Sequence, residues 1–178
     1  MLTATYSLVA LSVEQKNVRC DLSALQQFID SSARNAAQQD VVALETAIDK
    51  LSAFDQYCHS RKVELYVIPA IRKATREADP LLAELESLSF RGLCILRSLR
   101  EGVRSAMEQG RDKIEELCSS MEQYCANLYQ RLVKEEELFN IAQRVISMDE
   151  WFSIASDFLS DDAVRQPQRN RANRLRHT

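Results

Sequence analysis

The sequence predicts an all-α protein, an up-down-up-down four-helix bundle with a short helix at its C-terminal end. Only three glycines and three prolines occur in 178 residues, although 46% of the residues are hydrophobic. This composition favours long helices over the many turns of a β-sandwich. Apolar residues recur at alternating steps of three and four in four long stretches, as in helices that bury one face. The connections between these stretches are short, which predicts neighbouring helices that run in opposite directions.

The first predicted helix has the clearest apolar stripe, and the polar segment 31–40 after it predicts a loop or a frayed helix end. The second helix is predicted to run from about Asp40 to Ala78. Pro69 should bend it, because proline lacks the backbone donor and crowds the preceding turn. The stripes consist of Leu8, Leu11, Gln15, Val18, Leu22, Leu25 and Ile29 in the first helix, and of Leu44, Ile48, Leu51, Phe54, Cys58, Leu65 and Ile68 in the second.

The third predicted helix has a sharp start, since Asp79 can cap it and Pro80 suits its first position, and Gly110 should end it. After the fourth helix, Ser147 and Glu150 have the capping-box spacing that opens a short fifth helix. The stripes consist of Leu81, Leu85, Leu88, Gly92, Ile95, Leu99 and Val103 in the third helix, of Ile114, Leu117, Met121, Cys125, Leu128, Leu132, Glu135, Phe139 and Ile146 in the fourth, and of Trp151, Ile154, Ala155 and Phe158 in the fifth.

The composition changes after the fifth helix, so we divide the chain into a helical domain, 1–160, and a basic tail, 161–178. The tail has almost nothing to bury and is predicted to be disordered. Its arginines are a candidate contact with a partner, but a solvated end explains them as well. Nucleic acid is expected to bind weakly at most, because no aromatic residues are interleaved with these arginines. They are Arg165, Arg169, Arg171, Arg174 and Arg176.

The start of the chain does not have the pattern of a signal peptide, and no apolar run approaches the ~20 residues of a membrane span. We therefore expect a cytoplasmic protein with no membrane contact. The five cysteines form no C-x-x-C pair, which argues against zinc and thioredoxin-type motifs. No Ser-His-Asp set or phosphate-binding glycine loop occurs, so we expect no catalytic activity.

Polar residues interrupt the apolar stripes at several positions. Gln15 lies in the middle of the first stripe and Glu135 in the middle of the fourth. Glu64 shares a face of the second helix with apolar residues. A buried carboxylate is normally paired, protonated or bound to a metal. Carboxylates from facing helices can also form a di-metal centre, so an internal ion pair and a metal site both remain open.

Residues 131–151, RLVKEEELFNIAQRVISMDEW, resemble the fourth helix of the bacterial hemerythrin-like (HHE) family, in which H-x-x-x-E-E-x-x-L-F-P precedes a D-W or E-W pair. CHSRKVELYVIPAI in the second helix is similar to that family's H-H-x-x-K-E-E-x-x-L-F-P-A-L. LSVEQKNVRCDL resembles L-x-x-E-H-x-x-I-x-x-L, and SFRGLCIL resembles H-x-x-G-x-x-L. The resemblance implies a hemerythrin-like bundle over roughly residues 5–158.

The resemblance also implies former metal-site positions. In the family, histidines and carboxylates from the four helices hold two irons that bind oxygen or nitric oxide. Glu64 and Glu135 fall on carboxylate ligands, whereas every histidine position that can be aligned has another residue. The residues at the histidine positions are Gln15, Ser60, Ser89 and Arg131.

We therefore expect no bound cofactor. A guanidinium cannot lose its proton, so Arg131 should replace the metal and pair with Glu135, Glu64 or both. The expected function is that of a non-catalytic regulatory module that binds a protein partner, and an oligomer is compatible with the sequence. The alternative is an iron-binding oxygen, nitric oxide or redox sensor or carrier with an altered ligand set of Glu64, Glu135 and His59.

Overall fold

The protein is almost entirely helical in the described residues. The computed structural model describes the backbone of residues 2–36, 41–109 and 111–175 and the side chains of residues 5–31, 42–105 and 112–161. No strand occurs in this part of the chain, in agreement with the predicted all-α class. In chain order the elements are α1 (Leu2–Ala36), α2 (Val41–His59), the π-helix η1 (Val63–Val67), α3 (Ile68–Ala74), α4 (Asp79–Gln109), α5 (Arg111–Val145) and α6 (Met148–Leu175).

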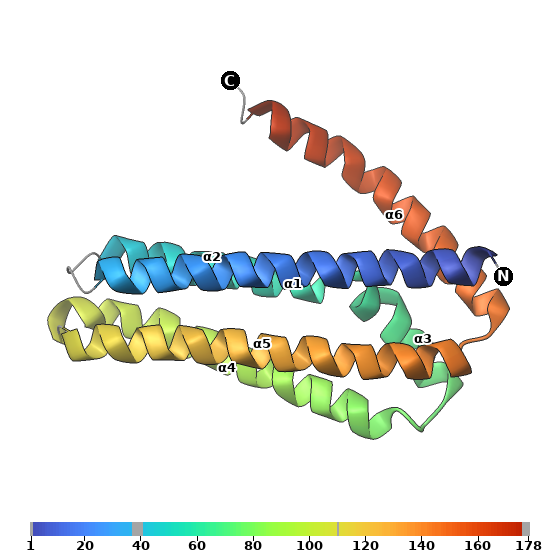
Figure 1. Cartoon of the computed structure of the whole chain (residues 1–178), viewed down its shortest axis with the longest axis horizontal. Coiled ribbons are helices and arrows are strands. Elements are labelled where there is room, and N and C mark those ends of the chain that lie inside the picture. The colour runs from blue at the N-terminus through green and yellow to red at the C-terminus, as the bar shows by residue number, and fades with distance from the viewer. Residues whose placement is uncertain (1, 37–40, 110, 176–178) are drawn as a thin grey trace.

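Helices α1, α2, α4 and α5 lie side by side, and consecutive helices run in opposite directions (Figure 1). Contacts join α1 to α2, α2 to α4, α4 to α5 and α5 to α1. These contacts close a ring of helices around a shared interior. Helix α6 packs against α1 at one end of the molecule and then projects away from the other helices (Figure 1).

The apolar interior has two parts. One cluster is built from α1, α2, α4 and α5 and includes Leu22, Leu51 and Met121. The other surrounds η1 and α3, and it includes Val67, Leu138 and Trp151. Most predicted stripe positions of α1 and α5 are buried, which agrees with the sequence pattern.

The second predicted helix differs most from expectation. It is interrupted at residues 60–62, continues as the π-helix η1 and ends at Ala74. Pro69 lacks a backbone N–H, and its ring would crowd the carbonyl of the residue four positions earlier, so a wider turn just before it relieves the conflict. The interruption rotates the next turn. Leu65, which we predicted to be buried, is 46% exposed, and Val63 and Val67 are buried instead.

Several predicted boundaries move by a few residues. Helix α1 continues to Ala36, so helix covers part of the expected loop, and residues 37–40 and Gly110 lie outside the described residues. Helix α4 begins at Asp79 with Pro80 in its first turn. At the start of α6, the backbone N–H of Glu150 donates to Ser147 Oγ at 3.3 Å, as the capping-box pattern predicts.

Helix α6 is longer than the short helix that we predicted. It runs for 28 residues, and residues 161–175, expected to form a disordered tail, continue it. No glycine lies in this segment to stop the helix, and Pro167 is accommodated within it. Arg176 and His177 lie outside the described residues.

Candidate functional site

The break between α2 and η1 brings an arginine into the interior. Arg61 lies in this break, and only 1% of it is exposed. The next residue donates its backbone N–H to the carboxylate of Glu14 on α1, with Lys62 N at 3.2 Å from Oε2 and 3.4 Å from Oε1. Glu14 Oε2 also lies 3.8 Å from Arg61 Nε. One carboxylate on α1 therefore caps the restarted helix and faces the buried guanidinium.

Arg61 forms an ion pair with Glu135 on α5. Arg61 Nη1 lies 2.8 Å from Glu135 Oε2 and 3.1 Å from Oε1, and Glu135 is fully buried. Burial raises the pKa of the Glu135 carboxyl, although Arg61 and Arg131 act against this rise. Burial alone would lower the pKa of Arg61. The negative charges of Glu135 and Glu14 outweigh the effect of burial, so the pKa of Arg61 is raised. Arg61 is therefore charged at neutral pH.

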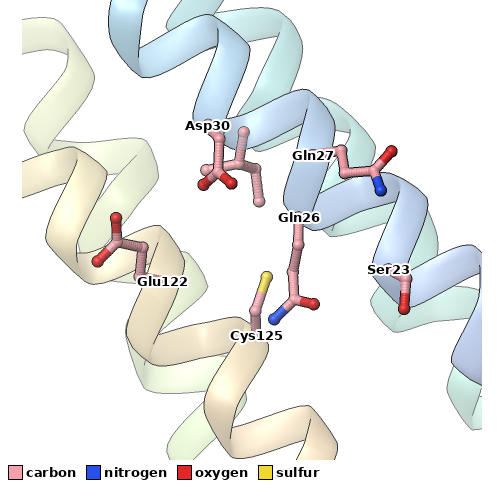
Figure 2. Close-up of a pocket in the computed structure, with 7 residues that line it drawn as sticks. Ser23, Gln26, Gln27, Asp30, Glu122 and Cys125 are labelled. Carbon is pink, nitrogen blue, oxygen red and sulfur yellow. The ribbon is translucent and has the colours of Figure 1, made fainter.

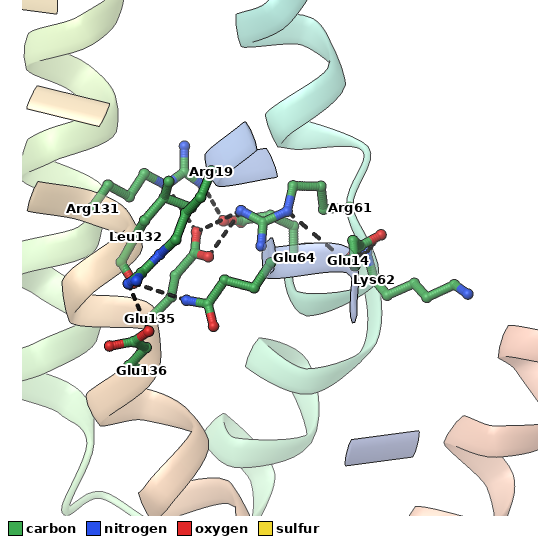
Figure 3. A network of polar contacts seen from close by, with 10 residues as sticks. Glu14, Arg19, Arg61, Lys62, Glu64, Arg131, Leu132, Glu135 and Glu136 are labelled. Atoms are coloured by element: carbon green, nitrogen blue, oxygen red, sulfur yellow. Dashed lines mark hydrogen bonds and ion pairs between the residues drawn. The ribbon is translucent and has the colours of Figure 1, made fainter. Parts of the chain in front are cut away.

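Arg131 on α5 contacts both carboxylates that the sequence predicted as site residues, Glu64 and Glu135. Its Nη2 donates to Glu64 Oε1 on η1, and its Nε lies 3.6 Å from Glu135 Oε1. Acidic and basic groups alternate in the order Glu64, Arg131, Glu135, Arg61 and Glu14 (Figure 3). We call these five residues the charged layer. They come from α1, α5 and the segment around η1, and they cross the interior of the helices.

Gln15 lies beside the charged layer and links α1 to α5. Its Nε2 donates to the backbone carbonyl of Leu132 at 2.9 Å. Nearer the surface, Arg19 Nη2 lies 2.6 Å from Glu136 Oε1, which joins the same two helices. Gln15 therefore acts as a neutral donor between helices.

The predicted site residues Ser60, Ser89 and His59 lie outside the charged layer. The side chains of the predicted tail arginines lie outside the described residues: Arg165, Arg169, Arg171, Arg174 and Arg176. Ser60 Oγ donates to Tyr57 O, and Ser89 Oγ donates to Leu85 O, each at 2.9 Å. His59 has a 48% exposed side chain, and its Nε2 lies 3.6 Å from Asp55 Oδ2. His59, Glu64 and Ser89 line one pocket of about 250 Å³. The structure thus brings Glu64, Arg131 and Glu135 together, and it places His59 and Ser89 in a pocket beside Glu64.

Sequence reasoning missed Arg61 and Glu14. The predicted stripe of the second helix passes from Cys58 directly to Leu65, a step of seven residues. A step of three from Cys58 falls on Arg61, so the gap in the stripe is the signal that could have identified it. Glu14 had no such signal, because its role depends on the break in a different helix.

A second pocket lies between α1 and α5, outside the charged layer. It has a volume of about 480 Å³, and Asp30, Glu122 and Cys125 are among the residues that line it (Figure 2). Burial raises the pKa of the Cys125 thiol to about 12, and Asp30 and Glu122 add to this effect. The thiol is therefore protonated at neutral pH and is no nucleophile there.

The donor atoms of the charged layer do not fit the pair of irons that the family resemblance implies. Arg131 contacts both Glu64 and Glu135, and Arg61 contacts Glu135 from the other side. Unit charges ~4 Å apart interact by ~4 kcal/mol at an effective dielectric constant of about 20, so each guanidinium would repel a cation that bound its carboxylate partner. Among the described residues, no three His, Cys, Asp or Glu side chains form a group that could hold a metal ion.

Comparison with known proteins returned no relatives: no family model matches the sequence, and neither a curated protein nor a solved structure matches it. The hemerythrin-like resemblance therefore stays a prediction from the motifs. Within the described residues, no helix combines the length and the apolar character needed to cross a bilayer.

Proposed function

We propose that the chain is an up-down-up-down four-helix bundle of the hemerythrin-like type in which the charged layer replaces the di-iron centre. In this proposal the bundle is a non-catalytic regulatory module that binds a protein partner. The observation that supports it best is the position of Arg131, which contacts both carboxylates that the resemblance assigns to metal binding.

The charged layer has a structural role in this proposal. It joins α1, η1 and α5 between the two apolar clusters. A slip of one helix along its neighbours would leave buried charges without partners, which is costly. The layer therefore favours one arrangement of the helices and gives the module a fixed surface.

The metal content of the full chain tests this proposal. The protein is produced in iron-rich culture, purified without chelator, and examined by elemental analysis and absorption spectroscopy. We expect substoichiometric metal in the wild type. Two irons per chain in the wild type would overturn the proposal.

An Arg131→His variant tests the role of the guanidinium directly. It removes a fixed charge and supplies an imidazole beside Glu64 and Glu135, so its metal content should rise above that of the wild type. Arg144→His, at an arginine on α5 with a 64% exposed side chain, is the matched control and should not change the metal content.

The alternative is an iron-binding oxygen, nitric oxide or redox sensor or carrier with an altered ligand set. The shared pocket of His59 and Glu64 is the observation that favours it. Stoichiometric metal in the wild type that is lost in both His59→Ala and Glu64→Gln would support this alternative.

A further inference from the structure

A small pocket is lined by residues of η1, α3 and α4 and by the last residue of α2. Its volume of about 250 Å³ lies below the ~300 Å³ at which sites for drug-sized ligands begin, so it suits a smaller molecule. A few polar groups beside apolar surface are typical of a ligand site. The polar residues that line it are His59, Glu64, Arg72, Glu86 and Ser89, and the aliphatic ones are Ile68, Leu82 and Leu85.

The charges in this pocket are separated along the chain by an apolar middle. Residues 75–78 connect α3 to α4, and Arg72 lies close to this connection. Glu64 lies eight residues before Arg72, and Ile68 lies halfway between them. At about 1.5 Å per residue, eight residues of helix span roughly 12 Å. The pocket therefore has an anionic end and a cationic end with apolar surface between them.

Glu64 supplies the anionic end. Its side chain is 23% exposed, and its Oε1 accepts a hydrogen bond from Arg131. No group among the described residues donates to its second oxygen, Oε2. An ammonium group has three N–H donors and a positive charge, so it fits this oxygen. The hydroxyl of Ser89 donates to Leu85 O and can accept a second of these donors.

Arg72 supplies the cationic end. Its Nη2 pairs with Glu86 Oε1, and the two side chains are 48% and 68% exposed. A guanidinium has five N–H donors, so Arg72 can bind a second carboxylate beside that of Glu86. An exposed pair of this kind contributes little stability, so a ligand carboxylate can also take the place of Glu86.

We propose that this pocket binds a short linear zwitterion, an ω-amino acid. Its ammonium group pairs with Glu64, its carboxylate pairs with Arg72, and its methylene chain packs against Ile68 and Leu85. An α-amino acid carries both charges at one carbon atom and does not reach both ends. Glu64 also belongs to the charged layer, so the ligand contacts the layer through this residue. This small-molecule site goes beyond the proposed protein-binding function and does not depend on it.

Isothermal titration calorimetry of the full chain in metal-free buffer tests the inference with probes of equal carbon number. 5-Aminovalerate carries its two charges at opposite ends, and its isomer norvaline carries both at one end. Pentylamine has the ammonium group alone, and pentanoate has the carboxylate alone. We expect 5-aminovalerate to bind at least about tenfold more tightly than each of the other three, because only it can pair at both ends. A wild type that does not bind 5-aminovalerate, or that binds norvaline equally well, overturns the inference.

Arg72→Gln tests the cationic end by itself. It should weaken the binding of 5-aminovalerate to the level of pentylamine and leave the binding of pentylamine unchanged, since pentylamine has no group that pairs with Arg72. Arg76→Gln is the matched control, because it removes an arginine whose side chain is 87% exposed and which does not line the pocket. It should bind like the wild type. Equal weakening of both compounds by Arg72→Gln, or equal effects of Arg72→Gln and the control, would contradict the proposal.

Glu64→Gln tests the anionic end and should weaken 5-aminovalerate and pentylamine alike. Circular dichroism checks its fold, because Glu64 also pairs with Arg131. Arg72 lies outside the charged layer, so its variant tests the site even if Glu64→Gln unfolds. Binding of 5-aminovalerate only after iron is added would overturn the inference, whereas two irons per chain in the purified protein would overturn the proposed function alone.

Discussion

Arg61, Arg131 and Glu135 are charged residues with at most 3% of their surface exposed. Opposite charges lie 2.8 Å from Arg61 Nη1 and 3.6 Å from Arg131 Nε, which offsets part of the cost of removing these groups from water. Arg61 Nη2 and Arg131 Nη1 are also buried, and no described side chain or backbone group accepts a hydrogen bond from either. The removal of one member of a buried Arg–Glu pair should therefore cost much more stability than the removal of both members.

Replacement of Arg61 by Met is expected to lower the free energy of unfolding by about 3–5 kcal/mol, because it leaves Glu135 buried beside one guanidinium at 3.6 Å. The double variant R61M/E135L should recover most of this loss, since it replaces the pair by apolar groups. Urea denaturation measures both values. R144M removes an exposed arginine of α5 as a control and should cost less than about 1 kcal/mol. A double variant less stable than R61M would contradict this account.

The stability of R61M should also depend on pH. Burial raises the pKa of Glu135, and the loss of Arg61 removes one of the charges that oppose this rise. A carboxyl with a raised pKa in the folded state takes up a proton on folding. Its contribution to stability is therefore complete at a pH below the unfolded-state pKa. This contribution is lost as the pH rises through the folded-state pKa. The difference in stability between wild type and R61M should therefore be larger at pH 8 than at pH 5. An equal difference at both pH values would argue against a buried, ionisable Glu135.

At the scale of the helices, the sequence predicted most of α1, α4 and α5, because their stripes are regular and their ends have clear signals. Pro69 correctly indicated a disturbance in the second helix. The break at residues 60–62 was not predicted, because a proline perturbs the turn before it, whereas the helix breaks where a neighbour can satisfy the free N–H groups. Here the neighbour is Glu14 of α1, which accepts the N–H of Lys62. Such a partner is set by tertiary structure and leaves no local pattern.

Glu14→Ala should destabilise the start of η1. It removes the acceptor of the Lys62 N–H and a charge 3.8 Å from Arg61 Nε, and a lost helix cap costs about 0.5–2 kcal/mol. Hydrogen exchange of the segment 60–64 should become faster, whereas exchange in the middle of α5 should change little. Glu14→Gln keeps an acceptor oxygen and should lie between wild type and Glu14→Ala. Unchanged exchange in 60–64 would show that Glu14 is not the cap.

At the scale of the molecule, two apolar clusters are held together by helices that pass through both. Helices α1, α4 and α5 contribute residues to each cluster, so the clusters should unfold together. The buried cysteines report on this cooperativity. Cys58 and Cys125 belong to one cluster, and burial raises the pKa of each thiol to about 12.

Alkylation with iodoacetamide at pH 8 should therefore modify Cys20 and Cys94, which are exposed, and leave Cys58 and Cys125 unmodified in the folded protein. In urea, all four should react. Mass spectrometry of peptides, taken over a urea series, should give one midpoint for Cys58 and Cys125, equal to the midpoint of the circular dichroism transition. Labelling of Cys58 well below that midpoint would show that its cluster opens separately.

The alternating order of the charged layer also limits how this sequence can change over evolutionary time. Glu135 contacts both guanidinium groups, so any single substitution of Arg61 or Arg131 leaves a buried carboxylate with fewer partners. A loss of about 3–5 kcal/mol is a large share of the 5–15 kcal/mol that typically separates folded from unfolded protein. Lineages that carry this layer should therefore lose an arginine of the layer together with a carboxylate partner, and a single substitution towards a metal-binding set should be tolerated only where a bound cation replaces the lost positive charge.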